Sequence, residues 1–174
     1  RPGAPCVLGT FTSNVDMRTG APAFGTPEYM RATQMTGQMA RFYGLPLRSS
    51  GTCAANVPDG QAMWETSNSL WAAVQSQTNM VYHAAGWLEG GLIASPEKFV
   101  MDCEVLQQIQ RYFEPVVTAT TPDDIAVDAI ASVGDAGHFF GVEHTQERYS
   151  SAFWQPYLAD WTNYEGWDLA GGVW

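Results

Sequence analysis

Short apolar runs and longer amphipathic segments follow one another three times along the chain. The apolar runs, rich in β-branched and aromatic residues, lie at 6–12, 45–49 and 79–84. After each run comes a loop of small residues and then a segment with helical spacing of its apolar positions. The order is therefore βαβαβα, which favours parallel strands joined by right-handed crossovers.

The three expected helices have recognisable ends. Thr26-Pro27-Glu28 supplies an N-cap, a proline in the first turn and an early acid, and Gly44 with Pro46 ends this helix. The second helix is expected over 59–77, and the third begins at Ser95-Pro96-Glu97 and extends to about 113. The spacing of apolar residues predicts which side chains of the first and third helices face the protein core. They are Ala32, Met35, Met39, Phe42, Phe99, Cys103, Leu106 and Phe113.

Three βα units in roughly 115 residues extrapolate to a (β/α)8 TIM barrel of about 250 residues or more. We therefore expect residues 1–118 to be later βα units of an incomplete barrel, with a small three-stranded α/β domain as the alternative. Thr121-Pro122-Asp123 predicts a short helix, and residues 119–174 form an aromatic-rich helical and loop extension. We expect this extension to pack on the barrel or on a second subunit, as part of a homo-oligomer.

Composition narrows the functional classes. The 174 residues carry a net charge of -10 with only 8 Lys and Arg, which argues against a nucleic-acid-binding protein. No stretch approaches the roughly 20 apolar residues of a membrane span. The cysteines Cys6, Cys53 and Cys103 lack any C-x-x-C spacing, which favours free thiols in a reducing compartment. A cytoplasmic location is the resulting expectation.

In a parallel α/β barrel, ligands bind at the carboxyl ends of the strands, where the βα loops gather. This rule selects three segments, at 13–24, 49–56 and 83–89. No G-x-S-x-G elbow and no glycine-rich phosphate loop occurs in the sequence. A zinc site from Cys53, His83 and Glu89 is chemically sound but not favoured, and His138 and His144 have a spacing more typical of structural histidines.

Several strings along the chain resemble one known family. They are Val15-Asp16-Met17-Arg18-Thr19-Gly20-Ala21-Pro22, Pro58-Asp59-Gly60-Gln61-Ala62, Gly137-His138-Phe139-Phe140-Gly141 with Glu143-His144-Thr145, and Phe153-Trp154-Gln155-Pro156. Together they resemble the C-terminal portion of the trimethylamine methyltransferase family. The sequence is similar to the branch without pyrrolysine, which includes glycine betaine methyltransferases.

The resemblance implies a TIM barrel that moves a methyl group from a methylated amine to the Co(I) centre of a separate corrinoid protein. The chain itself would then bind no cofactor and need no catalytic side chain. A quaternary ammonium substrate is favoured, because displacement expels a neutral amine, and its fixed cation suits aromatic faces and a carboxylate. The candidate substrate-binding residues, in or directly beside the three selected segments, are Asp16, Phe24, Tyr82, His83, Trp87 and Glu89.

Other interpretations of these residues stay open. Trp87 is also suited to covering the barrel rim, Tyr82 to pointing outward to the helices, and Asp16 to pairing with Arg18. His83 fits a hydrogen-bonded core histidine. For the whole chain, the alternatives are a zinc-dependent methyltransferase of a corrinoid system and a betaine-binding module or fragment without catalytic activity.

Overall fold

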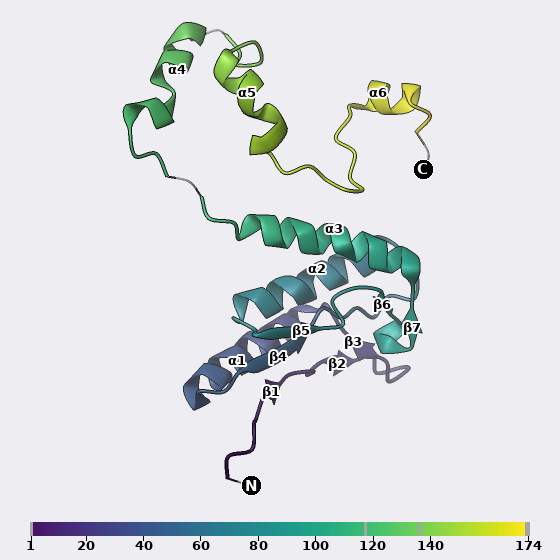
Figure 1. Cartoon of the computed structure of the whole chain (residues 1–174). Helices are drawn as coiled ribbons and strands as arrows, with labels where there is room; N and C mark the ends of the chain where they lie inside the picture. Colours follow the sequence, from purple (N-terminus) through teal and green to yellow (C-terminus); the bar gives the residue numbers. More distant parts are fainter. Residues whose placement is uncertain (1, 117, 136, 173–174) are drawn as a thin grey trace. The chain divides into compact units, whose positions relative to one another are not determined.

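The chain forms two compact units, divided between Gln107 and Gln108. The computed structural model describes residues 2–116, 118–135 and 137–172 (Figure 1). Helix α3 (Pro96–Tyr112) runs across the division between the units. No helix in these ranges is long and apolar enough to cross a membrane.

A three-stranded parallel sheet organises the first unit. Its strands are β1 (Leu8–Gly9), β4 (Leu47–Ser50) and β5 (Met80–Tyr82), in the order β1-β4-β5. Leu8 pairs with Leu47, and Ser50 pairs with Tyr82. The parallel arrangement predicted from the sequence is confirmed, and the sheet does not close on itself within the described part of the chain.

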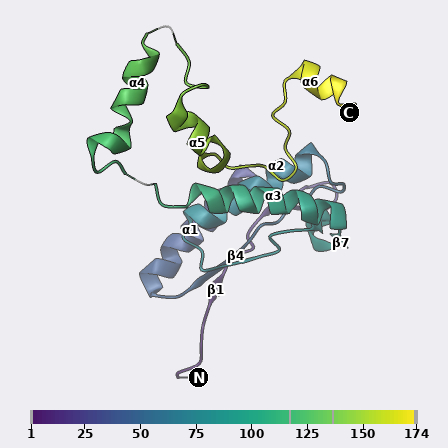
Figure 2. The same ribbon diagram turned by 45° about the horizontal axis from the view of Figure 1, so that its top comes forward.

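Two helices cover one face of β4. They are α1 (Pro27–Tyr43) and α2 (Gly60–Gln75), and Figure 2 shows them with the sheet from a second angle. The Thr26 hydroxyl accepts a hydrogen bond from the backbone N–H of Tyr29, and Gly44 ends α1 in the left-handed conformation. The Asp59 carboxylate accepts from the N–H of Ala62 at the start of α2. All three helices predicted from the sequence are confirmed, α2 with slightly shorter bounds.

The face of α1 that is buried differs from the predicted one. Met35 and Phe42 are exposed, whereas the buried side is made of Tyr29, Thr33, Gly37 and Ala40. The cause is close helix packing, since a Cβ at Gly37 would lie 2.6 Å from the carbonyl oxygen of Ser76. Small residues therefore mark the contact between α1 and α2, and the large apolar residues lie outside it.

The prediction for α3 is wrong in part, since Cys103 and Leu106 are half-buried but the two phenylalanines are not. Phe99 and Phe113 are exposed, and the buried positions of the first half of the helix include the charged residues Lys98 and Asp102. These two side chains form a salt bridge inside the unit. Because these buried side chains are charged, the spacing of apolar residues along α3 indicated a neighbouring face of the helix instead.

Two short antiparallel pairs lie in segments that the sequence predicted as loops. Strand β2 (Asn14–Val15) pairs with β3 (Pro22–Ala23), between β1 and α1. Strand β6 (Trp87–Leu88) pairs with β7 (Ile93–Ala94), and the 3-10 turn η1 (Glu89–Gly91) connects them. Both hairpins lie in loops that follow strands of the parallel sheet.

The second unit contains short helices. They are η2 (Pro122–Ile125), α4 (Val127–Val133), α5 (Glu143–Ala152) and α6 (Tyr164–Leu169). The predicted start at Thr121 is confirmed, because the Asp124 carboxylate accepts from the backbone N–H groups of Thr120 and Thr121. These hydrogen bonds lower the pKa of Asp124 to about 2. The sequence did not predict α5 and α6.

Candidate functional site

The loops that follow the three parallel strands meet at the carboxyl end of the sheet. The N–H of Glu89 donates to the carbonyl of Ala55 at 2.8 Å, and the N–H of Gly90 donates to the carbonyl of Cys53 at 3.2 Å. On its other side, Gly90 approaches the first loop so closely that a Cβ there would lie 3.1 Å from Cγ of Pro22. The structure therefore brings together the three segments selected from the sequence.

An aromatic cluster lies where these loops meet. The ring of Phe11, two residues after β1, has its centroid 5.9 Å from that of His83 and 6.2 Å from that of Trp87. The His83 and Trp87 rings are 4.0 Å apart. Phe11 is 41% exposed, and His83 and Trp87 are half-buried, so the cluster is partly open. Phe11 was not among the candidates from the sequence, because its position reads as the end of a strand.

Phe24 forms the layer beneath this cluster. It is buried and lies edge-on to Phe11 and to Tyr29, at centroid distances of 4.9 and 5.6 Å. The Tyr29 hydroxyl in turn donates to the carbonyl of Ser50 at 3.0 Å. Phe24 thus holds Phe11 in place from the core side.

Hydrogen bonding and backbone conformation fix the position of His83. Its Nδ1 lies 3.1 Å from the Ser50 hydroxyl, and its backbone has a φ of 53°, which is uncommon for a residue with a side chain. Burial, and secondly the positive charge of Arg48, lower the pKa of His83 below its usual 6.5. The imidazole is therefore mostly neutral at pH 7.

The Tyr82 ring stacks with the Arg48 guanidinium and lies at the edge of the cluster of Phe11, His83 and Trp87. The Arg48 guanidinium carbon lies 5.0 Å from the centroid of the Tyr82 ring. Side chains alternate between the two faces along a strand, and Ser50 pairs with Tyr82. Arg48 and Tyr82 therefore lie on the same face of the sheet, opposite the face of Leu47 and Ser49. Tyr82 is 45% exposed there.

Trp87 packs against a small core beneath the loops. Its ring contacts the cluster formed by Cys53, Ala55, Ala62 and Leu88, and a Cβ at Gly91 would overlap it at 2.3 Å. Its indole N–H is buried and has no hydrogen-bond partner among the described residues. Trp87 therefore has both a packing role and a ring close to His83.

The two acidic candidates lie on exposed loops. The Asp16 carboxylate accepts from the Thr19 hydroxyl at 2.7 Å and from the backbone N–H of Arg18 at 3.3 Å, and these bonds lower the pKa of Asp16. Its partner at Arg18 is thus the backbone rather than the guanidinium. Glu89 is exposed, with a backbone φ of 49°.

The proposed zinc ligands do not form a site. Cys53 is buried and its thiol donates to the carbonyl of Trp87 at 2.9 Å, and burial raises the pKa of this thiol. A raised pKa disfavours the thiolate that zinc requires. Over residues 2–116, 118–135 and 137–172, no three His, Cys, Asp or Glu residues are grouped to hold a metal ion. The donor set of Cys53, His83 and Glu89 therefore does not fit zinc.

Two buried charged groups that the sequence did not indicate hold the loops in place. The Glu65 carboxylate, from α2, accepts from the N–H groups of Ala54 and Ala55 at 2.7 and 3.0 Å. The Asp102 carboxylate, from α3, accepts from the N–H of Gly86 at 2.9 Å. Both residues read in the sequence as ordinary polar positions of amphipathic helices.

The salt bridge of Lys98 and Asp102 is almost completely buried. The Lys98 ammonium also donates to the Thr66 hydroxyl at 2.8 Å, which links α3 to α2. Burial raises the pKa of Asp102, against the opposite influence of Lys98 and of the Gly86 N–H. The pair thereby connects two helices to the loop between His83 and Trp87.

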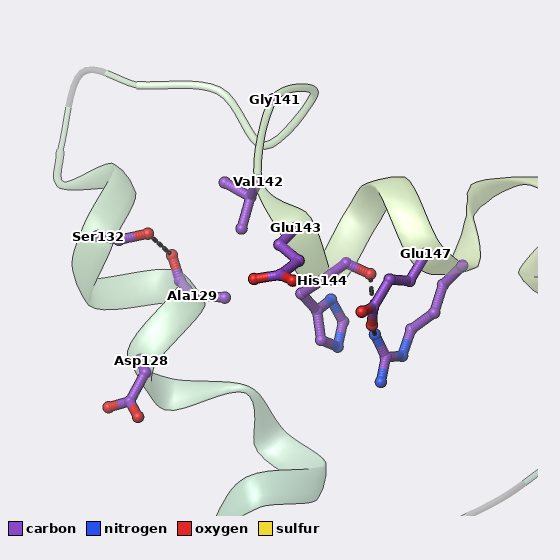
Figure 3. A pocket seen from close by; sticks show the side chains of 9 residues that line it. Asp128, Ala129, Ser132, Gly141, Val142, Glu143, His144 and Glu147 are labelled. Atoms are coloured by element: carbon purple, nitrogen blue, oxygen red, sulfur yellow. Dashed lines mark hydrogen bonds and ion pairs between the residues drawn. The ribbon is translucent and has the colours of Figure 1, made fainter.

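The second unit holds a separate pocket of about 720 Å³ between α4 and α5 (Figure 3). Its lining includes Asp128, Glu143 and His144, together with Glu147 and Arg148, which form an ion pair with each other at 2.8 Å. The other histidine of this region, His138, lies 5.2 Å from the ring of Phe140. Its lining contains the imidazole of His144 but no Phe, Tyr or Trp side chain, so it suits a quaternary ammonium group less well than the cluster of Phe11, His83 and Trp87.

Comparison with known proteins identifies the relatives of the chain. The family described as trimethylamine methyltransferase (MTTB) matches residues 1–174. A glycine betaine methyltransferase of Desulfitobacterium hafniense strain Y51 is 35% identical over 167 residues, which cover 95% of this chain and 34% of that protein. A trimethylamine methyltransferase, MttB2, of Methanosarcina mazei is 29% identical over 173 residues, covering 98% of this chain and 34% of that protein. The chain thus spans about a third of the length of these curated relatives.

Proposed function

The chain belongs to the trimethylamine methyltransferase family, and from this membership we propose that the protein transfers a methyl group from a methylated amine to the Co(I) centre of a corrinoid protein. A quaternary ammonium compound such as glycine betaine is the favoured substrate, with trimethylamine as the other family substrate. The observation that carries this proposal is the partly open aromatic cluster of Phe11, His83 and Trp87 at the carboxyl end of the sheet.

Aromatic rings suit a quaternary ammonium group because this cation has no N–H donors. Each well-placed face contributes about 0.5 to 2 kcal/mol, and more when water is excluded. Phe11 and Trp87 supply such faces, and Phe24 holds Phe11 from below. The neutral state of His83 at pH 7 keeps a competing positive charge out of the cluster.

The leaving group explains why this cluster needs no acid. When Co(I) attacks a methyl carbon of a quaternary ammonium, the electron pair of the broken C–N bond stays on nitrogen. The products are a methyl-Co(III) corrinoid and a neutral tertiary amine, so no proton is required. The protein contributes orientation of the methyl carbon and exclusion of water, while Asp16 and Glu89 add negative charge to the surrounding loops.

We also propose that the parallel sheet is part of a TIM barrel completed by further βα units. The order β1-β4-β5, and three loops that meet at one end, support this architecture. The methyl-accepting corrinoid protein would approach that same end. A cytoplasmic homo-oligomer remains the expectation for the complete enzyme.

The proposal is tested on the complete polypeptide that carries this chain. Incubation with glycine betaine and a corrinoid protein reduced to Co(I) should yield dimethylglycine and methyl-Co(III) in equal amounts. Mass spectrometry measures the dimethylglycine, and absorbance measures the methyl-Co(III) corrinoid. Binding of glycine betaine by calorimetry without any methyl transfer would instead indicate a betaine-binding module. Absence of both binding and turnover with every methylated amine would refute the proposal.

A further inference from the structure

Arg48 lies beside the aromatic cluster on the face of the sheet that helices do not cover. It shares this face with Met80 and Tyr82, which are 47% and 45% exposed. Its guanidinium extends across the sheet, since a Cβ at Gly9 would lie 3.0 Å from Nη2 of Arg48, and its carbon lies 5.0 Å from the Tyr82 ring. The side chain is thus held between β1 and β5.

Within the part of the chain that the structure describes, the Arg48 guanidinium forms no ion pair with an acidic side chain. The ion pairs found over residues 2–116, 118–135 and 137–172 join Lys98 to Asp102, Arg111 to Glu114 and Arg148 to Glu147. The groups that face the guanidinium are an aromatic ring, a glycine backbone and, further along, the imidazole of His83. A half-buried arginine that stacks on an aromatic ring keeps its N–H donors free for an anion.

A fixed positive charge is unexpected beside a site for a cationic substrate. The Arg48 charge repels tetramethylammonium, choline and protonated amines. This repulsion is offset only when the ligand also carries a negative charge that pairs with Arg48. The arrangement of Arg48 on Tyr82, next to His83 and then Phe11 and Trp87, places a cation and aromatic faces side by side. A zwitterion matches both halves.

We propose that Arg48 binds the carboxylate of the substrate and selects N-methylated amino acids of the betaine type over methylated amines without a carboxylate. Tyr82 supports the guanidinium from below, so its role is to position Arg48 rather than to contact the ammonium group. This inference rests on the proposed function and names the substrate class of the same site.

The test compares ligands that differ only in the negative charge. For the complete wild-type polypeptide, we expect glycine betaine to have a kcat/KM at least 100-fold above that of choline or of glycine betaine methyl ester. In Arg48→Met, the value for glycine betaine should fall about 100-fold, whereas the value for choline should stay within about threefold or rise. Arg31→Met, which removes an exposed arginine of α1, serves as the matched control and should leave the ratio unchanged.

The outcomes separate this inference from the proposed function. Equal turnover of glycine betaine and its methyl ester by the wild type would overturn the role of Arg48 and leave the methyltransferase standing. An equal loss for both substrates in Arg48→Met would show a structural role and would also overturn the selection. If Arg48→Met does not fold, the comparison of the two ligands on the wild type still decides the question. No turnover of any methylated amine would refute the proposed function itself.

Discussion

The substitution Asp102→Asn tests how the buried salt bridge supports the candidate site. The variant keeps the shape of the side chain and an acceptor for the Gly86 N–H, but it leaves the Lys98 ammonium, 0% exposed, without its negative partner. Breaking a buried pair from one side costs about 3 to 5 kcal/mol.

We therefore expect Asp102→Asn to lower the free energy of unfolding by about 3 to 5 kcal/mol at pH 7, measured by urea denaturation of the complete polypeptide. The double variant Lys98→Met with Asp102→Asn removes both charges, keeps an acceptor for the Gly86 N–H, and should recover most of the loss. A decrease below about 1 kcal/mol for Asp102→Asn, or no recovery in the double variant, would refute the buried pair.

Further predictions concern the cluster and the packing beneath it. Phe11→Ala should weaken glycine betaine binding about tenfold in calorimetry, whereas Phe42→Ala, on the exposed side of α1, should leave it unchanged; equal effects would contradict a role for the Phe11 ring. The pKa of His83 is lower in the folded protein than in the unfolded chain, so the unfolded chain binds more protons near this pKa. The contribution of His83 to stability is therefore present above pH 6.5 and is lost as the pH falls below 6.5 through the pKa of the folded state. His83→Asn should remove this component from a pH series of unfolding free energies, and an unchanged series would contradict it. Gly37→Ala should lower the free energy of unfolding by about 1 to 2 kcal/mol, because overpacking against Ser76 outweighs the gain in helix propensity. Gly60→Ala, where a Cβ has open space around it, should not lower it. A Gly37→Ala variant that is more stable than the wild type would refute the close helix contact.

Helix ends and the succession of strands and helices along the chain could be predicted because they depend on local chemistry. Thr26 and Gly44 mark the ends of α1 through a hydroxyl acceptor and a left-handed backbone, and both signals are visible in the sequence. The alternation of apolar runs and amphipathic segments likewise indicated the parallel sheet. Such features need no knowledge of what packs against them.

Buried faces could not be predicted where packing uses small or charged residues. The contact of α1 with α2 depends on Gly37, and that of α3 depends on Lys98 and Asp102, so a search for large apolar side chains selected the wrong faces. For the candidate site, the sequence selected three segments that the structure places next to one another. It could not show that Phe24 is buried beneath Phe11 or that Arg48 stacks on Tyr82, because both depend on neighbours from other strands.

The most direct test of the central claim is an experimentally determined structure of the complete polypeptide with glycine betaine bound. We expect the trimethylammonium group to lie within about 6 Å of the ring centroids of Phe11 and Trp87, at the carboxyl end of β1, β4 and β5. A ligand held elsewhere, such as in the pocket between α4 and α5, would contradict the claim that these aromatic residues bind the methyl donor.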